Sequence, residues 1–117
     1  MNVPIQRVDK PWGYELIFAH TDRYVGKILH VDAGQALSLQ YHEKKDETLY
    51  MREGSVALFV EEGNEIIERT LKAGESYRIR PFTRHRMVAG EDGCDIIEVS
   101  TPELDDVVRI EDRYGRA

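Results

Sequence analysis

Turn-forming residues interrupt this chain about once every ten residues, and that spacing limits what it can fold into. The turn signals lie at Asp32–Gly34, Glu53–Gly54, Glu61–Asn64, Lys72–Gly74 and Gly90–Gly93. Between them, short runs alternate apolar and polar residues, and no stretch before Thr101 repeats apolar residues with the 3.6-residue period of a helix. The pattern predicts an all-β sandwich or jelly roll rather than a parallel sheet with crossover helices.

The runs between the turns give the expected strands. They are Trp12–Phe18, Tyr24–Val31, Glu47–Met51, Ser55–Val60, Glu65–Leu71, Ser76–Arg80, His85–Ala89 and Cys94–Ser100. A chain of 117 residues can bury one core, so we expect one domain over residues 1–117, with a barrel at 10–100. The tail at 101–117 is expected to turn after Pro102 and to pack Val107, Val108 and Ile110 against the barrel.

Composition narrows the classes of partner. The formal net charge is -6, which argues against nucleic acid or an anionic membrane, because both favour a basic face. No apolar run reaches the roughly 20 residues that span a bilayer, and residues 1–10 lack the apolar centre of a secretion signal, so we expect a cytoplasmic protein. Cys94 is the single cysteine, which excludes an intrachain disulfide, and we expect it to be buried.

The stretch Gly34–Gly54 carries the candidate site. In a strand, Ser38, Gln40 and His42 share one face, whereas Leu37, Leu39 and Tyr41 share the other. Glu47, from the next strand, and His85, from a later one, are expected to point toward Gln40 and His42. Two imidazoles, a carboxylate and an amide oxygen suit one divalent ion, with zinc as our first choice and manganese, cobalt, iron or nickel as alternatives.

Arginines cluster around His85, at Arg78, Arg80, Arg84 and Arg86. They are either solvated cations at strand edges or an anion site, because guanidinium groups pair well with phosphate oxygens. The sequence alone leaves both interpretations open.

These residues resemble the cupin superfamily. Gly34, His42, Glu47 and Gly54 stand at the intervals of its first motif, with Gln40 in place of the first His. In the second motif, which begins at Gly74, His85 keeps the ligand position, but Arg80 stands where the family has Pro.

The chain also resembles a narrower group, the cupin domain of type II mannose-6-phosphate isomerases, which usually follows a mannose-1-phosphate guanylyltransferase domain. The likeness lies in Lys10-Pro-Trp-Gly13, in the Gln-x-His form and in Glu111-Asp-Arg-Tyr-Gly-Arg116. Two segments depart from that group: Glu43-Lys44-Lys45 replaces His-His-Arg, and Thr48-Leu49 replaces His-Trp.

The resemblance implies a cupin-type jelly-roll barrel, or double-stranded β-helix, with a short C-terminal tail. It implies that Gln40, His42, Glu47 and His85 ligate the metal. It also implies pocket candidates for substrate contact or proton transfer, namely Lys27, Arg86, Glu98 and Arg116, of which Glu98, Lys27 and Arg116 are the expected catalytic residues.

The reaction implied by the resemblance is isomerisation of mannose 6-phosphate to fructose 6-phosphate through a cis-enediol. It needs a polarised oxygen, a base near the carbon-bound proton and a cationic grip on phosphate. Glu98 is our first choice for the base and Lys27 the second, although the two could instead form a structural ion pair. The grip is predicted from a set that includes Arg86, Lys45, Arg80 and Arg116.

Two other functions stay open. The first is a non-catalytic cupin that binds a sugar or a sugar phosphate, which the replaced segment Glu43–Leu49 favours. The second is an iron dioxygenase, although the amide of Gln40 would be an unusual ligand there. We also expect a homodimer that packs sheet to sheet through Leu37, Leu39 and Tyr41.

Overall fold

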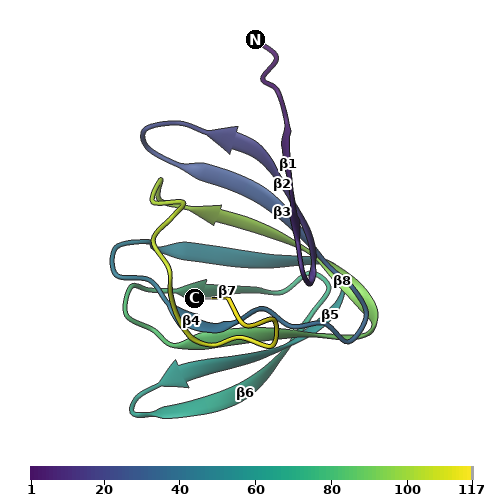
Figure 1. Ribbon diagram of the computed structural model, residues 1–117, viewed down its shortest axis with the longest axis vertical. Helices are drawn as coiled ribbons and strands as arrows, with labels where there is room; N and C mark the ends of the chain where they lie inside the picture. Colours follow the sequence, from purple (N-terminus) through teal and green to yellow (C-terminus); the bar gives the residue numbers. More distant parts are fainter. Residues whose placement is uncertain (117) are drawn as a thin grey trace.

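The computed structural model describes residues 1–116 and contains nine antiparallel strands (Figure 1). They are β1 (Gln6–Lys10), β2 (Gly13–His20), β3 (Val25–Val31), β4 (Leu39–Tyr41), β5 (Glu47–Glu62), β6 (Glu65–Lys72), β7 (Ser76–Ile79), β8 (His85–Ser100) and β9 (Val108–Glu111). This part of the chain forms no helix, and therefore none long and apolar enough to cross a membrane.

The strands form two layers that share β5 and β8. One layer runs β1-β2-β3-β8-β5-β7, and the other runs β9-β4-β8-β5-β6. The second half of β8 pairs with β3, whereas its first residue, His85, pairs with Gln40 of β4. Two long strands that bend from one layer into the other curl the sheet into two facing layers, which confirms the predicted all-β jelly roll.

The predicted turns at Glu53–Gly54 and Gly90–Gly93 are wrong as strand ends, because each lies inside one 16-residue strand. The reason is visible in which residues are buried. Along β5 the buried positions change from odd-numbered (Leu49, Met51) to even-numbered (Val56, Leu58), and the register of its pairing with β8 shifts at the same place. An extra residue in a bulge resets the alternation, so that both halves of the strand face the core.

Gly54 tests the importance of this bulge. Its φ is +80°, and a Cβ added there would lie 2.5 Å from the carbonyl oxygen of Gly93. We expect Gly54→Ala to lower the free energy of unfolding by about 2–3 kcal/mol, as measured by urea denaturation.

The matched control for Gly54→Ala is Gly63→Ala at the β5–β6 turn. Gly63 also has a positive φ of +66°, but nothing lies within 4 Å of the added Cβ. Gly63→Ala should lower the free energy of unfolding by about 1 kcal/mol, because only backbone strain opposes it. Equal losses for the two variants would show that the bulge tolerates a side chain.

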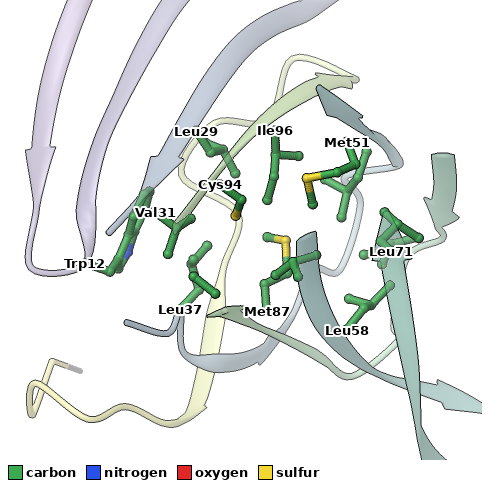
Figure 2. Close-up of a cluster of buried hydrophobic side chains, with 14 of the residues drawn as sticks. Trp12, Leu29, Val31, Leu37, Met51, Leu58, Leu71, Met87, Cys94 and Ile96 are labelled. Atoms are coloured by element: carbon green, nitrogen blue, oxygen red, sulfur yellow. The ribbon is translucent and has the colours of Figure 1, made fainter. Parts of the chain in front are cut away.

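The core fills the space between the layers (Figure 2). Leu49, Met51, Leu58 and Ile96 are completely buried there. Each such side chain contributes roughly 1.5–3 kcal/mol by leaving water. Cys94 packs in the same cluster, as predicted, and burial, followed by the charge of Asp95, raises the pKa of its thiol to about 11.

The segment before β4 differs from the prediction. Leu37 is buried in the core, not on the outer wall with Leu39 and Tyr41, because residues 37 and 38 precede the strand and do not follow its alternation. Leu37 therefore cannot contribute to an interface between two copies. Leu39 and Tyr41 are half-buried, and the homodimer stays a prediction.

Two strands were missed in the sequence. β1 lies in a charged stretch, Gln6–Lys10, and pairs with β2 at the edge of its layer. The tail does more than pack on the barrel: its Val108–Glu111 stretch forms β9 alongside β4, as the yellow end of the ribbon shows (Figure 1). Both strands are short edge strands, for which the sequence signal is weak.

Candidate metal centre

Three buried side chains converge where β4, β5 and β8 meet. His42 follows β4, Glu47 opens β5 and His85 opens β8. All three are at most 3% exposed, and one ligand atom from each lies within 4.8 Å of the others. Glu47 Oε1 is 3.6 Å from His42 Nε2 and 3.3 Å from His85 Nε2.

Hydrogen bonds fix the orientation of both imidazole rings. Nδ1 of His42 lies 2.5 Å from the carbonyl oxygen of Asp106, and Nδ1 of His85 lies 2.9 Å from that of Thr83. Since a carbonyl can only accept, Nδ1 is the donor in each ring, and in the neutral form with this tautomer the lone pair on Nε2 is left to bind a metal. Both Nε2 atoms are buried and have no hydrogen-bond partner among the described residues.

This donor set fits a divalent metal ion. A bare buried nitrogen is costly unless something binds it, and one cation would satisfy both nitrogens and the carboxylate together. Gln40, the fourth predicted ligand, is half-buried and lines the adjoining cavity, and its backbone pairs with that of His85. Its Oε1 accepts a hydrogen bond from Ser38 Oγ at 2.5 Å.

A line of alternating charges leads away from the triad. Lys45 Nζ lies 3.1 Å from Glu47 Oε2 and 3.0 Å from Glu98 Oε2. Lys27 Nζ lies 3.6 Å from Glu98 Oε2 and 2.7 Å from Glu15 Oε2. Lys10 ends the line, 3.3 Å from Glu15 Oε1. Every buried charge in the line thus has an opposite neighbour.

The two carboxylates beside Lys45 have opposite pKa shifts. Burial opposes ionisation of Glu47, but the two imidazoles and Lys45 hold its pKa well below the usual value. Burial, followed by the negative charge of Glu47, raises the pKa of Glu98, and Lys45 and Lys27 offset this in part. Glu98 is therefore the carboxylate in the line that more readily takes up a proton.

A cavity of about 90 Å³ opens beside the triad. Its cationic lining residues are Lys10, Lys27, Lys45, Arg109 and Arg116, and its acidic ones are Glu15, Glu47 and Glu98. This lining is net positive even before a metal is added, in a chain whose formal net charge is -6. Such a concentration of positive charge favours an anionic ligand.

The predicted site residues divide into two groups. Glu98, Lys27, Lys45 and Arg116 line the cavity together with Gln40, His42 and Glu47. His85 lies behind this lining, in contact with Glu47.

Arg86 and Arg80 are not among the residues that line the cavity. Arg86 donates to the carbonyl oxygens of Leu37 and Glu111, and so ties the tail to the barrel. Arg80 is exposed. Arg78 and Arg84, from the same arginine cluster, are paired with Asp46 and Glu61.

The sequence interpretation missed three charged cavity residues: Lys10, Glu15 and Arg109. Glu15 carried a signal, because in a strand it points to the same face as the apolar Ile17, yet it is charged. Lys10 and Arg109 lie at the ends of two edge strands, β1 and β9, which the alternation did not reveal.

Curated relatives share this domain. The chain is 36% identical over 116 residues to the mannose-1-phosphate guanylyltransferase ManC of Salmonella typhimurium, covering 95% of this chain and 23% of that protein. It is 32% identical over 114 residues to a D-lyxose/D-mannose isomerase of Thermosediminibacter oceani, covering 78% of this chain and 63% of that protein. The chain thus spans about a quarter of the length of the guanylyltransferase.

Solved structures agree on the fold. KdgF from Halomonas sp. superposes with a TM-score of 0.74 at 26% identity, over 88% of this chain and 91% of that one. Oxalate decarboxylase from Bacillus subtilis superposes with a TM-score of 0.80 at 16% identity, over 91% of this chain and 30% of that one.

The family comparison covers almost the whole chain. Residues 3–112 match the family described as "Mannose-6-phosphate isomerase C-terminal". Together with the barrel and the buried His-Glu-His triad, this match shows that the chain is a cupin and belongs to the mannose-6-phosphate isomerase C-terminal family.

Proposed function

We propose that this protein is a metal-dependent isomerase that converts mannose 6-phosphate to fructose 6-phosphate through a cis-enediol. The observation that carries the proposal is the buried triad of His42, Glu47 and His85 beside a net positive cavity. The family match and the likeness to a D-lyxose/D-mannose isomerase support an aldose–ketose reaction.

The ligands of the ion are His42, Glu47, His85 and, by resemblance, Gln40, and zinc is our first choice. When bound, the ion acts as a Lewis acid toward the oxygen on C1 or C2 of the sugar. The protein's own contribution begins with Nε2 of each imidazole, which is held bare by the carbonyls of Asp106 and Thr83.

Glu98 is the proposed base. It lines the cavity, and its raised pKa suits a group that takes a proton from one carbon and returns it to the next. Lys27 and Lys45, at 3.6 and 3.0 Å from its Oε2, would orient the carboxylate and stabilise negative charge on the enediol.

The phosphate would be held at the part of the cavity that the chain ends build. Arg116, predicted from the sequence, lines the cavity and donates to Asp112 through Nε and Nη2, so its guanidinium is held in place. Arg109 and Lys10 bring further positive charge to the same cavity. In the proposed phosphate grip, Arg109 and Lys10 therefore join Arg116 in place of Arg86 and Arg80.

A second function has an observation in its favour. Lys27 contacts both Glu15 and Glu98, which is the structural ion pairing weighed against catalysis. If that pairing is the whole role of both Lys27 and Glu98, neither is a base, and the protein binds a sugar phosphate without converting it.

The test is an isomerase assay on protein loaded in turn with zinc, manganese, cobalt, nickel and ferrous iron. We expect fructose 6-phosphate to form from mannose 6-phosphate, and Glu98→Gln to lower kcat by at least about 100-fold. Glu91→Gln, at an exposed position of β8, is the control and should leave kcat unchanged.

Binding of mannose 6-phosphate by calorimetry without turnover with any metal would overturn the isomerase and support the binding protein. Turnover of unphosphorylated mannose or lyxose, but not of mannose 6-phosphate, would overturn the phosphate grip. Oxygen consumption that depends on ferrous iron would instead favour a dioxygenase.

A further inference from the structure

Asp106, in the segment between β8 and β9, grips the loop that follows β4. Its Oδ1 accepts a hydrogen bond from the backbone N–H of Glu43 at 3.0 Å. Its Oδ2 accepts from Lys44 at 2.7 Å and from Lys45 at 2.9 Å. Its carbonyl oxygen faces Nδ1 of His42. One residue from the tail thus holds four consecutive residues of the loop, 42–45.

Two of the residues held in this way belong to the candidate site. The Asp106 carbonyl orients the His42 ring and leaves its Nε2 bare toward Glu47. The Asp106 carboxylate fixes the backbone of Lys45, whose ammonium bridges Glu47 and Glu98. A displaced Asp106 would therefore disturb both the ligand and its charged neighbour.

The same tail segment walls the cavity. Leu104, Val107, Arg109 and Arg116 all line it, and they flank Asp106 in sequence. Other bonds of the tail reach the barrel away from the triad: Tyr114 Oη donates to Gln35 Oε1, and Arg113 donates to the Gly34 carbonyl. Asp106 joins this wall to residues 42–45, next to the pairing of β9 with β4.

We propose that Asp106 is a positioning residue that couples docking of the tail, residues 101–116, to metal binding at His42. The inference rests on the metal site of the proposed function but not on the isomerase reaction. Coupling between two sites is reciprocal. If a docked tail raises metal affinity by a given factor, bound metal must favour the docked tail by the same factor.

The experiment measures zinc affinity of the full chain by competition with a chromogenic chelator. Asp106→Ala removes the carboxylate that holds the loop, so that the Asp106 carbonyl no longer has a fixed position against His42, and we expect the variant to bind zinc about 10–100-fold more weakly than the wild type. Asp106→Asn keeps one acceptor oxygen, so its zinc affinity should lie between those of the wild type and Asp106→Ala. Asp105→Asn, at the neighbouring exposed position, is the matched control, and its zinc affinity should stay within about twofold of the wild-type value.

Amide hydrogen exchange gives the reciprocal readout. In the wild type, zinc should slow exchange in residues 101–111, whereas in Asp106→Ala that slowing should be lost. Wild-type zinc affinity in folded Asp106→Ala, or equal exchange of the tail with and without zinc in the wild type, would overturn the coupling. Should Asp106→Ala fail to fold, the affinity of Asp106→Asn relative to Asp105→Asn decides in its place.

The failures of the two proposals can be told apart. Zinc binding with a coupled tail but no turnover would refute the isomerase and leave the role of Asp106 standing. Turnover in an Asp106→Ala variant with unchanged zinc affinity would refute the role of Asp106 and leave the isomerase standing. Absence of any zinc binding by the wild type would refute both.

Discussion

Glu47→Gln is expected to weaken zinc binding by more than about 100-fold, since even groups one shell further from a metal contribute about 10–100-fold. The carboxylate is the one anion among the three converging ligands, and its Oε1 lies 3.3 and 3.6 Å from the two imidazoles. An amide has the same shape but no charge to offer a divalent cation. Isomerase activity should be lost together with the metal.

Zinc titration by calorimetry or chelator competition measures this effect, and circular dichroism checks that the barrel is intact. Glu68→Gln, on the exposed face of β6, removes the same charge away from the triad and should keep wild-type affinity. Unchanged affinity in folded Glu47→Gln would mean that the triad is a hydrogen-bonded cluster of the core and not a metal centre.

Lys45→Met is expected to lower the free energy of unfolding by about 3–5 kcal/mol. The Lys45 side chain is 5% exposed and its ammonium sits between two buried carboxylates. Burial would lower its pKa, but Glu98 and then Glu47 raise it above the usual value, so the charge persists in the folded protein. Methionine fills similar space but leaves both carboxylates without that cation.

Urea denaturation of the metal-free protein measures this loss. Lys44→Met, at the exposed neighbouring position, should change stability by less than about 0.5 kcal/mol. Adding Glu98→Gln to Lys45→Met should recover part of the loss, because it removes one of the stranded charges. A loss below about 1 kcal/mol for Lys45→Met would show that water or Lys27 compensates for the missing ammonium.

The candidate triad could be predicted from the sequence because histidine and glutamate are typical metal ligands. His42 and Glu47 are five residues apart, and the resemblance to the second cupin motif added His85, whereas the turn-rich pattern alone predicted only an all-β sandwich or jelly roll. The contacts among the charged residues beside the triad could not be predicted in this way. The contact between Lys27 and Glu98 depends on the register of β3 against β8, which joins residues 71 positions apart.

The arginines near His85 show what a local sequence pattern leaves undecided. Four cations near His85 allowed two interpretations, an anion site or solvated cations at strand edges, and none of the four is among the residues that line the cavity. Arg78 and Arg84 pair with acidic neighbours, and Arg86 ties down the tail. The bulges in β5 and β8 change which residues face inward. Strict alternation of apolar and polar residues cannot predict where such bulges lie.

The two strands shared by both layers have a consequence for when a metal can enter. Glu47 and His85 are the first residues of these two strands. The distance between them is therefore fixed only after the whole sheet has folded and curled. A chain still emerging from the ribosome would hold His42 and Glu47 near each other but lack the third donor. Maturation should therefore proceed from a folded, empty barrel to a loaded one, and the unfolded chain should compete poorly for the ion.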